Sequence, residues 1–307
     1  NKRLAQGPGN LLAYIVDQGR SVKEFLTAPY LVLPGAKHQD QPDNPDDDWR
    51  SRLQAVMIHG EPLSGLVTDA LWLGQTPTSV TNIARHRAWE ILRRFFDFDV
   101  LDIASRNVEA PKGDPLPTVK HPACVACHGA NLDNFAAAFW DYQKDDRYTH
   151  NPKLPPQFLS LGLYGQKVPN DDPNRLGKMM QLMTSDPEGS GYPFARSMAK
   201  MAYTMLTGRD AVKEPKLDEM DYEPKMRRFQ VQNDFFDEMA KFLHGTGYNF
   251  RELVIEMAMS PWCATTGEFT EPLSPNREIE LKDTIGPRMI TPEVLAIRLR
   301  QLFGNDV

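Results

Sequence analysis

The sequence predicts a mainly α-helical protein with long loops. Three observations support this prediction. Apolar residues recur at helical spacing along most of the chain, strand-like alternation never extends beyond a few residues, and 25 prolines cluster between the helical segments. A length of 307 residues suffices for one large or two modest domains. Hydrophobic residues make up 41% of the chain and charged residues 25%, as in ordinary globular proteins.

Two short helices are expected in residues 11–30. Apolar residues at 11, 12, 15 and 16, and again at 22, 25 and 26, fit helical spacing with a break near Gly19. Residues 31–55 are expected to form a loop that contains the acidic run 43–48. This run is typical of a solvated loop, since it lacks the glycine and the terminal glutamate of a calcium-binding loop.

An amphipathic helix is expected over residues 81–98, with Ser79 or Thr81 as its N-cap. Apolar side chains recur there every three or four positions, and arginines fill the positions between them. The proline-rich residues 111–122 should be extended, because the residue before a proline disfavours the helical conformation.

Helical spacing marks five later segments: residues 132–142, 193–206, 229–243, 250–259 and 291–303; residues 176–184 form a further methionine-bearing segment. Asn249, or the glycine turn before it, is expected to start the helix at residue 250. Thr291, followed by a proline at the first helical position, is expected to cap the last helix. Any sheet should be minor.

The most specific feature of the chain is the pentapeptide Cys-Val-Ala-Cys-His at residues 124–128. Two thiols three positions apart, Cys124 and Cys127, can each form a thioether to a haem vinyl group. The imidazole of His128 then lies where it can bind the iron from the proximal side. This string is the attachment signature of c-type haem, so the sequence predicts one covalently bound haem c.

Other interpretations of the two thiols are a structural zinc half-site, a redox pair or buried cysteines. A zinc site normally needs a second pair of ligands at similar spacing. Cys263 is the only other thiol and is isolated in the sequence, so it is expected to be a buried or incidental cysteine. A thioredoxin-like redox pair would lie beside a βαβ pattern, which the sequence does not contain.

The sixth iron ligand is expected to come from a methionine or a second histidine. A Met thioether would raise the reduction potential of the haem, whereas a second His would lower it. We assign Met183 as the expected cofactor-binding residue, because small c-type cytochromes place this Met several tens of residues after the motif. The alternatives are Met179, Met180, Met198, Met201 and His150.

Several segments resemble the planctomycete-type cytochrome c-like proteins, a large bacterial family with a haem domain inside a helical chain. They are residues 20–30, the haem segment 122–128 with residues 132–135, residues 194–209 and residues 250–262. The chain differs from the family pattern in a long insertion, residues 141–173, and in the tail after Trp262. The resemblance implies a role in electron transfer.

The expected organisation has three parts: an N-terminal helical segment (1–110), a cytochrome c-like haem domain (111–210) and a C-terminal helical segment (211–307). We expect an electron-transfer protein that works with redox partners, inside a larger complex, rather than a catalyst in its own right. The alternatives are a haem enzyme, such as a peroxidase or oxidase subunit with an open sixth position, and an assembly subunit whose haem is structural.

The expected location is the periplasm or another exported compartment, because c-type haem is attached on the exported side of a membrane. Residues 1–6 do not begin an apolar signal segment, so we expect a mature or truncated form. A net charge of −6 disfavours nucleic acid and anionic membrane surfaces as partners. The sequence contains no apolar run of about 18 residues, so no membrane span is predicted.

Overall fold

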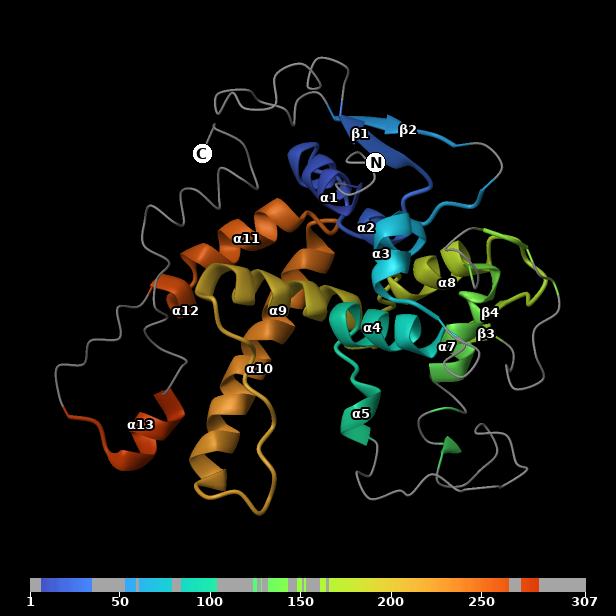
Figure 1. The fold of residues 1–307 in the computed structure, drawn as a ribbon. Helices are drawn as coiled ribbons and strands as arrows, with labels where there is room; N and C mark the ends of the chain where they lie inside the picture. The colour runs from blue at the N-terminus through green and yellow to red at the C-terminus, as the bar shows by residue number, and fades with distance from the viewer. Residues whose placement is uncertain are drawn as a thin grey trace. The chain divides into compact units, whose positions relative to one another are not determined.

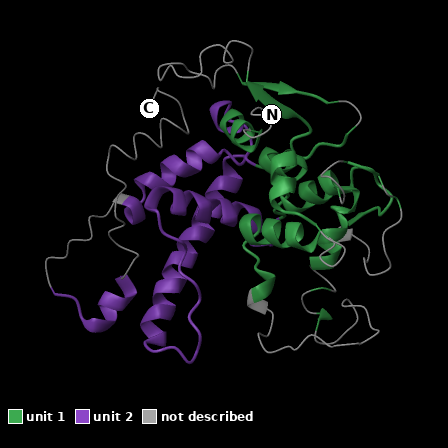
Figure 2. Cartoon of the chain, viewed as in Figure 1, with its two compact units in different colours: residues 1–14, 23–187 green, residues 15–22, 188–307 purple. Residues whose placement is uncertain are grey.

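The computed structural model describes residues 7–34, 53–58, 61–78, 84–103, 124–125, 128, 132–142, 148–150, 152, 161–163, 166–264 and 272–281. The predicted mainly helical class is confirmed, with four short strands as the sheet content of these residues (Figure 1). Backbone contacts divide the chain into two compact units (Figure 2). Unit 1 comprises residues 1–14 and 23–187, and unit 2 comprises residues 15–22 and 188–307.

The elements of unit 1 are α2 (Glu24–Thr27), β1 (Leu31–Pro34), β2 (Leu53–Val56), η4 (Gly65–Thr68), α3 (Ala70–Gln75), α4 (Arg85–Phe95), α5 (Val100–Ile103), α7 (Asp133–Ala137), η6 (Trp140–Tyr142), β3 (Leu161–Leu163), β4 (Gln166–Val168) and α8 (Arg175–Met183). Helix α1 (Gly7–Asp17) contributes residues to both units. The boundary between the two units after residue 187 lies inside the expected haem domain, residues 111–210. The expected three-part organisation stays a prediction.

The predicted helix break near Gly19 is confirmed. Gly19 has a φ of +59°, a left-handed conformation that glycine adopts without steric cost. The backbone N–H of Arg20 closes this turn onto the carbonyl of Ile15 at 2.8 Å. Helix α1 therefore ends at Asp17, and α2 begins after the turn.

The prediction that residues 31–55 form only a loop is wrong at both ends. Strands β1 and β2 pair antiparallel, with Leu31 opposite Val56 and Pro34 opposite Leu53. Each strand has four residues, too few for a period-two pattern to stand out in the sequence. The acidic run 43–48 lies outside the described residues.

The predicted amphipathic helix is present but shorter, because α4 covers Arg85–Phe95. The N-cap prediction is wrong: Ala84 holds this position with a φ of 60°, and no side chain caps the helix. The N–H of Ala84 instead donates to the hydroxyl of Thr78 at 2.6 Å. The chain thus enters the helix through a left-handed residue, which helical periodicity does not reveal.

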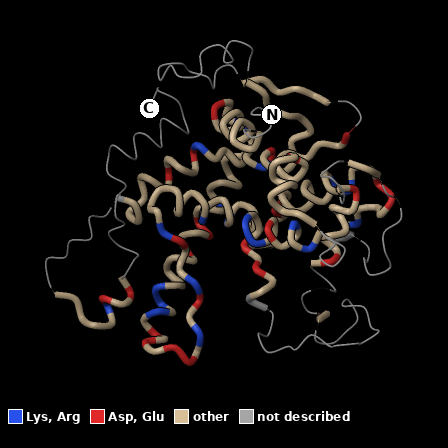
Figure 3. The backbone as a smooth tube through the Cα atoms, viewed as in Figure 1, with Lys and Arg blue, Asp and Glu red and all other residues tan. Residues whose placement is uncertain are grey.

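Unit 2 contains α9 (Pro193–Thr207), α10 (Tyr222–Gly245), α11 (Phe250–Met259), α12 (Pro261–Ala264) and α13 (Pro275–Leu281). Helices α9, α10 and α11 pack against one another, and α13 packs against α10. Figure 3 shows Lys and Arg along the first half of α10, where Arg227 pairs with Glu280 of α13 at 2.6 Å.

Asn249 caps α11 as predicted. Its side-chain oxygen accepts hydrogen bonds from the backbone N–H groups of Arg251 at 3.1 Å and Glu252 at 3.3 Å. Helix α10 begins earlier than predicted, at Tyr222. The helix predicted over residues 291–303, with Thr291 as its cap, lies outside the described residues. In the described part of the chain, no helix has both the length and the apolar character required to cross a bilayer.

Candidate haem-attachment site

A backbone hydrogen bond links Cys124 and His128. The backbone N–H of His128 donates to the carbonyl of Cys124 at 2.9 Å, the bond of an α-helical turn. This bond spans the four residues that separate the thiol-bearing residue from the imidazole-bearing one. Both side chains are half-buried. The other predicted attachment residue, Cys127, lies outside the described residues.

The ring nitrogen Nδ1 of His128 lies 3.0 Å from Oδ1 of Asp133. This contact is a hydrogen bond of the imidazole, and the side chain of His128 is 26% exposed. A carboxylate accepts hydrogen bonds, so the imidazole N–H is assigned to Nδ1. In that tautomer the lone pair is on Nε2, the nitrogen that can bind a metal.

The Asp133 carboxylate is fixed by Arg85 at the start of α4. Arg85 donates from Nε to Oδ1 at 2.7 Å and from Nη2 to Oδ2 at 2.9 Å. Such a two-point contact fixes both the position and the plane of the carboxylate. Burial alone would raise the pKa of Asp133, which is 0% exposed. The hydrogen bonds from His128 and Arg85, with the charge of Arg85, outweigh burial and hold this pKa below its ordinary value.

Arg87 connects the elements behind this site. Its fully buried guanidinium donates to three backbone carbonyls: Thr76 at 2.8 Å, Tyr142 at 2.6 Å and Leu73 at 3.0 Å. These carbonyls belong to the end of α3 and to η6. One side chain therefore holds α3, α4 and η6 together, and α7 is the helix immediately before η6.

Aromatic side chains of the segment after the motif enter the core of unit 1. Phe135 and Phe139 are buried, with ring centroids 6.2 Å apart, and Phe139 packs against Trp72 of α3 at 5.8 Å. The structure places Phe135 and Phe139 in α7 and just after it, and Trp140 is half-buried.

A second imidazole–carboxylate–guanidinium cluster is formed by His150, Asp141 and Arg175. The Nδ1 of His150 is 3.5 Å from Oδ1 of Asp141, and its side chain is 31% exposed. Arg175 of α8, which is 0% exposed, donates to both oxygens of the buried Asp141, from Nε at 3.0 Å and also from Nη2. The backbone N–H of Thr149, the residue before His150, donates to the carbonyl of Asp141 at 2.8 Å.

The predicted methionine ligands lie on two different helices. Met183, Met179 and Met180 lie on α8 in unit 1, the unit that contains Cys124 and His128. Met198 is buried and Met201 half-buried on α9 in unit 2. Within the described residues no group of three His, Cys, Asp or Glu side chains could hold a metal ion.

Cys263, the third thiol of the chain, is half-buried in α12 in unit 2. Burial raises the pKa of its thiol, an effect that a hydrogen bond with Ser260 partly offsets.

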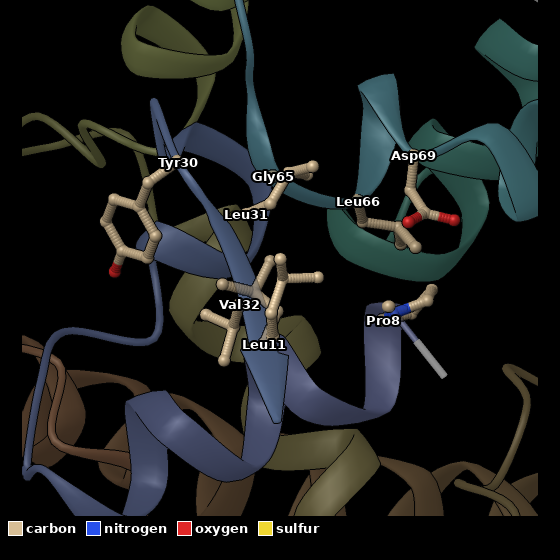
Figure 4. A pocket seen from close by; sticks show the side chains of 10 residues that line it. Pro8, Leu11, Tyr30, Leu31, Val32, Gly65, Leu66 and Asp69 are labelled. Atoms are coloured by element: carbon tan, nitrogen blue, oxygen red, sulfur yellow. The ribbon is translucent and has the colours of Figure 1, made fainter. Parts of the chain in front are cut away.

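A small cavity of unit 1 lies among the start of α1, strand β1 and η4 (Figure 4). Its lining is mostly apolar, with Leu11, Val32 and Leu66 among its residues. The polar group at its edge is Asp69, which caps α3 by accepting from the N–H groups of Leu71 and Trp72. Asp69 is thus already used in the fold, and the cavity contains none of the predicted haem ligands.

No protein-family model matches this chain, and neither a curated protein nor a solved structure matches it. The resemblance to planctomycete-type cytochrome c-like proteins therefore stays a prediction.

Of the three residues that would hold a haem c, the described part of the chain contains the thiol of Cys124 and the imidazole of His128. One backbone hydrogen bond links the two residues, and the imidazole has its Nδ1 engaged by Asp133, which leaves Nε2 as the nitrogen that can bind a metal. Sequence reasoning identified Cys124 and His128 but missed Arg85 and Asp133. No motif relates those two residues, which are 48 positions apart.

Proposed function

We propose that this protein is a c-type cytochrome that carries one haem and transfers single electrons. Cys124 and Cys127 attach the haem, and His128 binds its iron on the proximal side. The observation that carries the proposal is the Cys-Val-Ala-Cys-His string, together with the backbone hydrogen bond that links His128 to Cys124.

Attachment is an addition reaction. Each thiol would add across a vinyl double bond of the haem: one C–S bond would form, the thiol hydrogen would go to the other vinyl carbon, and no external oxidant or reductant would be consumed. Covalent attachment lets a loop-rich domain keep a cofactor that it does not fully enclose. The bound haem then supplies a metal centre that accepts one electron and releases it to a partner.

Met183 is the proposed sixth ligand, with His150 as the alternative. Met183 is buried in the unit that contains Cys124 and His128, which supports it. His150 has a buried carboxylate, Asp141, beside its Nδ1, as metal-binding histidines commonly do. The two ligands predict opposite effects on the reduction potential.

A second candidate function is a haem enzyme with an open sixth position. One observation favours it: the proximal imidazole of His128 contacts a carboxylate, Asp133, at 3.0 Å. A carboxylate partner raises the basicity of an imidazole ligand and so stabilises more oxidised iron. The candidates differ in whether the reduced iron has a vacant position.

The proposed location is the periplasm or another exported compartment, and the proposed setting is a larger electron-transfer complex. Attachment on the exported side of the membrane supports the location. The length of 307 residues supports the setting, since a freely diffusing electron carrier of this kind is expected to be much smaller.

The test is absorption spectroscopy of the full chain, expressed for export together with a c-type haem attachment system. The proposal predicts a low-spin haem spectrum on reduction, unchanged by carbon monoxide. Cys124→Ala with Cys127→Ala should abolish covalent haem, whereas the matched control Cys263→Ala should keep it. A spectrum altered by carbon monoxide would favour the enzyme. Haem-free wild-type protein would contradict both functions.

A further inference from the structure

This inference rests on the proposed function, because it concerns the residue behind the proximal ligand. We propose that Asp133, fixed by Arg85, is the positioning residue of His128. It orients the imidazole for iron and lowers the reduction potential of the haem relative to a histidine with a neutral acceptor.

The first step is orientation. His128 lies on a short turn, and a free imidazole there could rotate and exchange its two nitrogens. Asp133 removes this freedom by accepting from Nδ1 at 3.0 Å. Asp133 itself cannot turn away, since both of its oxygens accept from Arg85, at 2.7 and 2.9 Å. Its side chain is 1% exposed, so water does not compete for these oxygens.

The second step is electronic. A histidine that donates its Nδ1–H to a carboxylate becomes a stronger electron donor at Nε2 than one that donates to a neutral carbonyl. Stronger donation stabilises oxidised iron more than reduced iron. Hydrogen bonding around an axial ligand is one of the means by which a protein sets a haem potential.

The third step concerns the charge of Arg85. Arg85 orients the carboxylate, but its positive charge also draws electron density away from the oxygen that His128 contacts. The pair therefore makes two opposite predictions. Removal of the negative charge at Asp133 should raise the potential, and removal of the positive charge at Arg85 should lower it.

A purely structural ion pair between α4 and α7 would behave differently. Loss of either partner would then loosen the same contact, and both changes would move the haem environment in the same direction or leave it unchanged. The sign of the potential shift thus distinguishes a positioning role from a structural one, which a stability measurement alone would not.

The experiment is a redox titration of the purified full-length holoprotein and three variants, each first shown by intact mass to carry covalent haem. Asp133→Asn should raise the reduced-to-oxidised ratio at a fixed solution potential about tenfold, equivalent to about 59 mV for one electron. Arg85→Gln should lower this ratio. The control Asp69→Asn removes a carboxylate elsewhere in unit 1 but keeps an N-capping residue, and should leave the ratio unchanged.

Shifts of the same sign in both variants, or no shift in Asp133→Asn, would overturn the inference while the proposed function stands. If Asp133→Asn does not fold, the direction of the Arg85→Gln shift decides alone. Wild-type protein without covalent haem would instead refute the proposed function, and the intact mass reports this before any titration.

Discussion

Arg85 and Asp133 form a two-point hydrogen-bonded ion pair across 48 residues of sequence, with contacts of 2.7 and 2.9 Å. The pair joins the first residue of α4 to the first residue of α7. The same Asp133 oxygen that accepts from Arg85 also lies 3.0 Å from His128. The contact between two helices thereby determines how the proximal imidazole of the proposed haem site is held.

This pair should contribute measurably to folding. Asp133→Ala should lower the free energy of unfolding by about 3 kcal/mol, because it leaves the Arg85 guanidinium without its carboxylate in a largely buried place. Arg85→Met combined with Asp133→Ala should cost less than the two single costs added together. Urea denaturation of the three variants measures the coupling, and strictly additive costs would show that the pair is energetically unimportant.

Arg87→Met should destabilise the chain by roughly 3 kcal/mol, because three backbone carbonyls lose a buried donor worth about 1 kcal/mol each. The matched control is Arg94→Met on the same helix, whose side chain is 57% exposed and paired with Glu90. It should cost less than about 1 kcal/mol. Equal losses in a urea titration would contradict the role assigned to Arg87.

The three cysteines should differ sharply in a thiol assay. In the denatured holoprotein only Cys263 should react, because Cys124 and Cys127 are consumed by thioethers. The denatured Cys263→Ala variant should show no reactive thiol. Two additional thiols in the wild-type protein would contradict attachment at the motif.

In the native protein Cys263 should react slowly with an alkylating reagent near neutral pH. Burial raises the pKa of this thiol, so less of the reactive thiolate is present at a given pH than for an ordinary cysteine. Its rate should therefore continue to rise at alkaline pH, above the pH where a model thiol has levelled off. A rate that levels off together with the model thiol would show that the pKa is not raised.

Met183→Leu should open the sixth iron position if Met183 is the ligand. The reduced variant should then bind carbon monoxide, and His150→Ala should not. Leucine nearly conserves the buried volume, so the stability loss should remain below about 1.5 kcal/mol. Carbon monoxide binding by His150→Ala alone would transfer the ligand assignment to His150.

Most helices of the described chain could be predicted from the sequence, because their apolar periodicity is strong. Helices α9 and α11 are close to their predicted bounds, and Asn249 was identified as the cap of α11. The failures are short or non-periodic features. Strands β1 and β2 are too short to show alternation, and the left-handed Ala84 before α4 has no residue signature, since alanine seldom adopts that conformation.

The candidate site could be predicted only in part. Cys124 and His128 belong to a local motif, so the backbone hydrogen bond between them follows from adjacent sequence. The partners of His128 depend on tertiary contacts, because Arg85 reaches Asp133 only when α4 and α7 pack together. On sequence alone, Arg85 is one of several arginines on an amphipathic helix, and nothing distinguishes it from Arg93 or Arg94.

The central claim is tested most directly by locating the haem on the chain. Trypsin should release residues 121–144 as one peptide that contains Cys124, Cys127 and His128, and should leave Cys263 on a different peptide. Mass spectrometry of the holoprotein digest should find the first peptide heavier by one haem and without free thiols. Finding that peptide at its unmodified mass, with both thiols open to alkylation, would contradict the account.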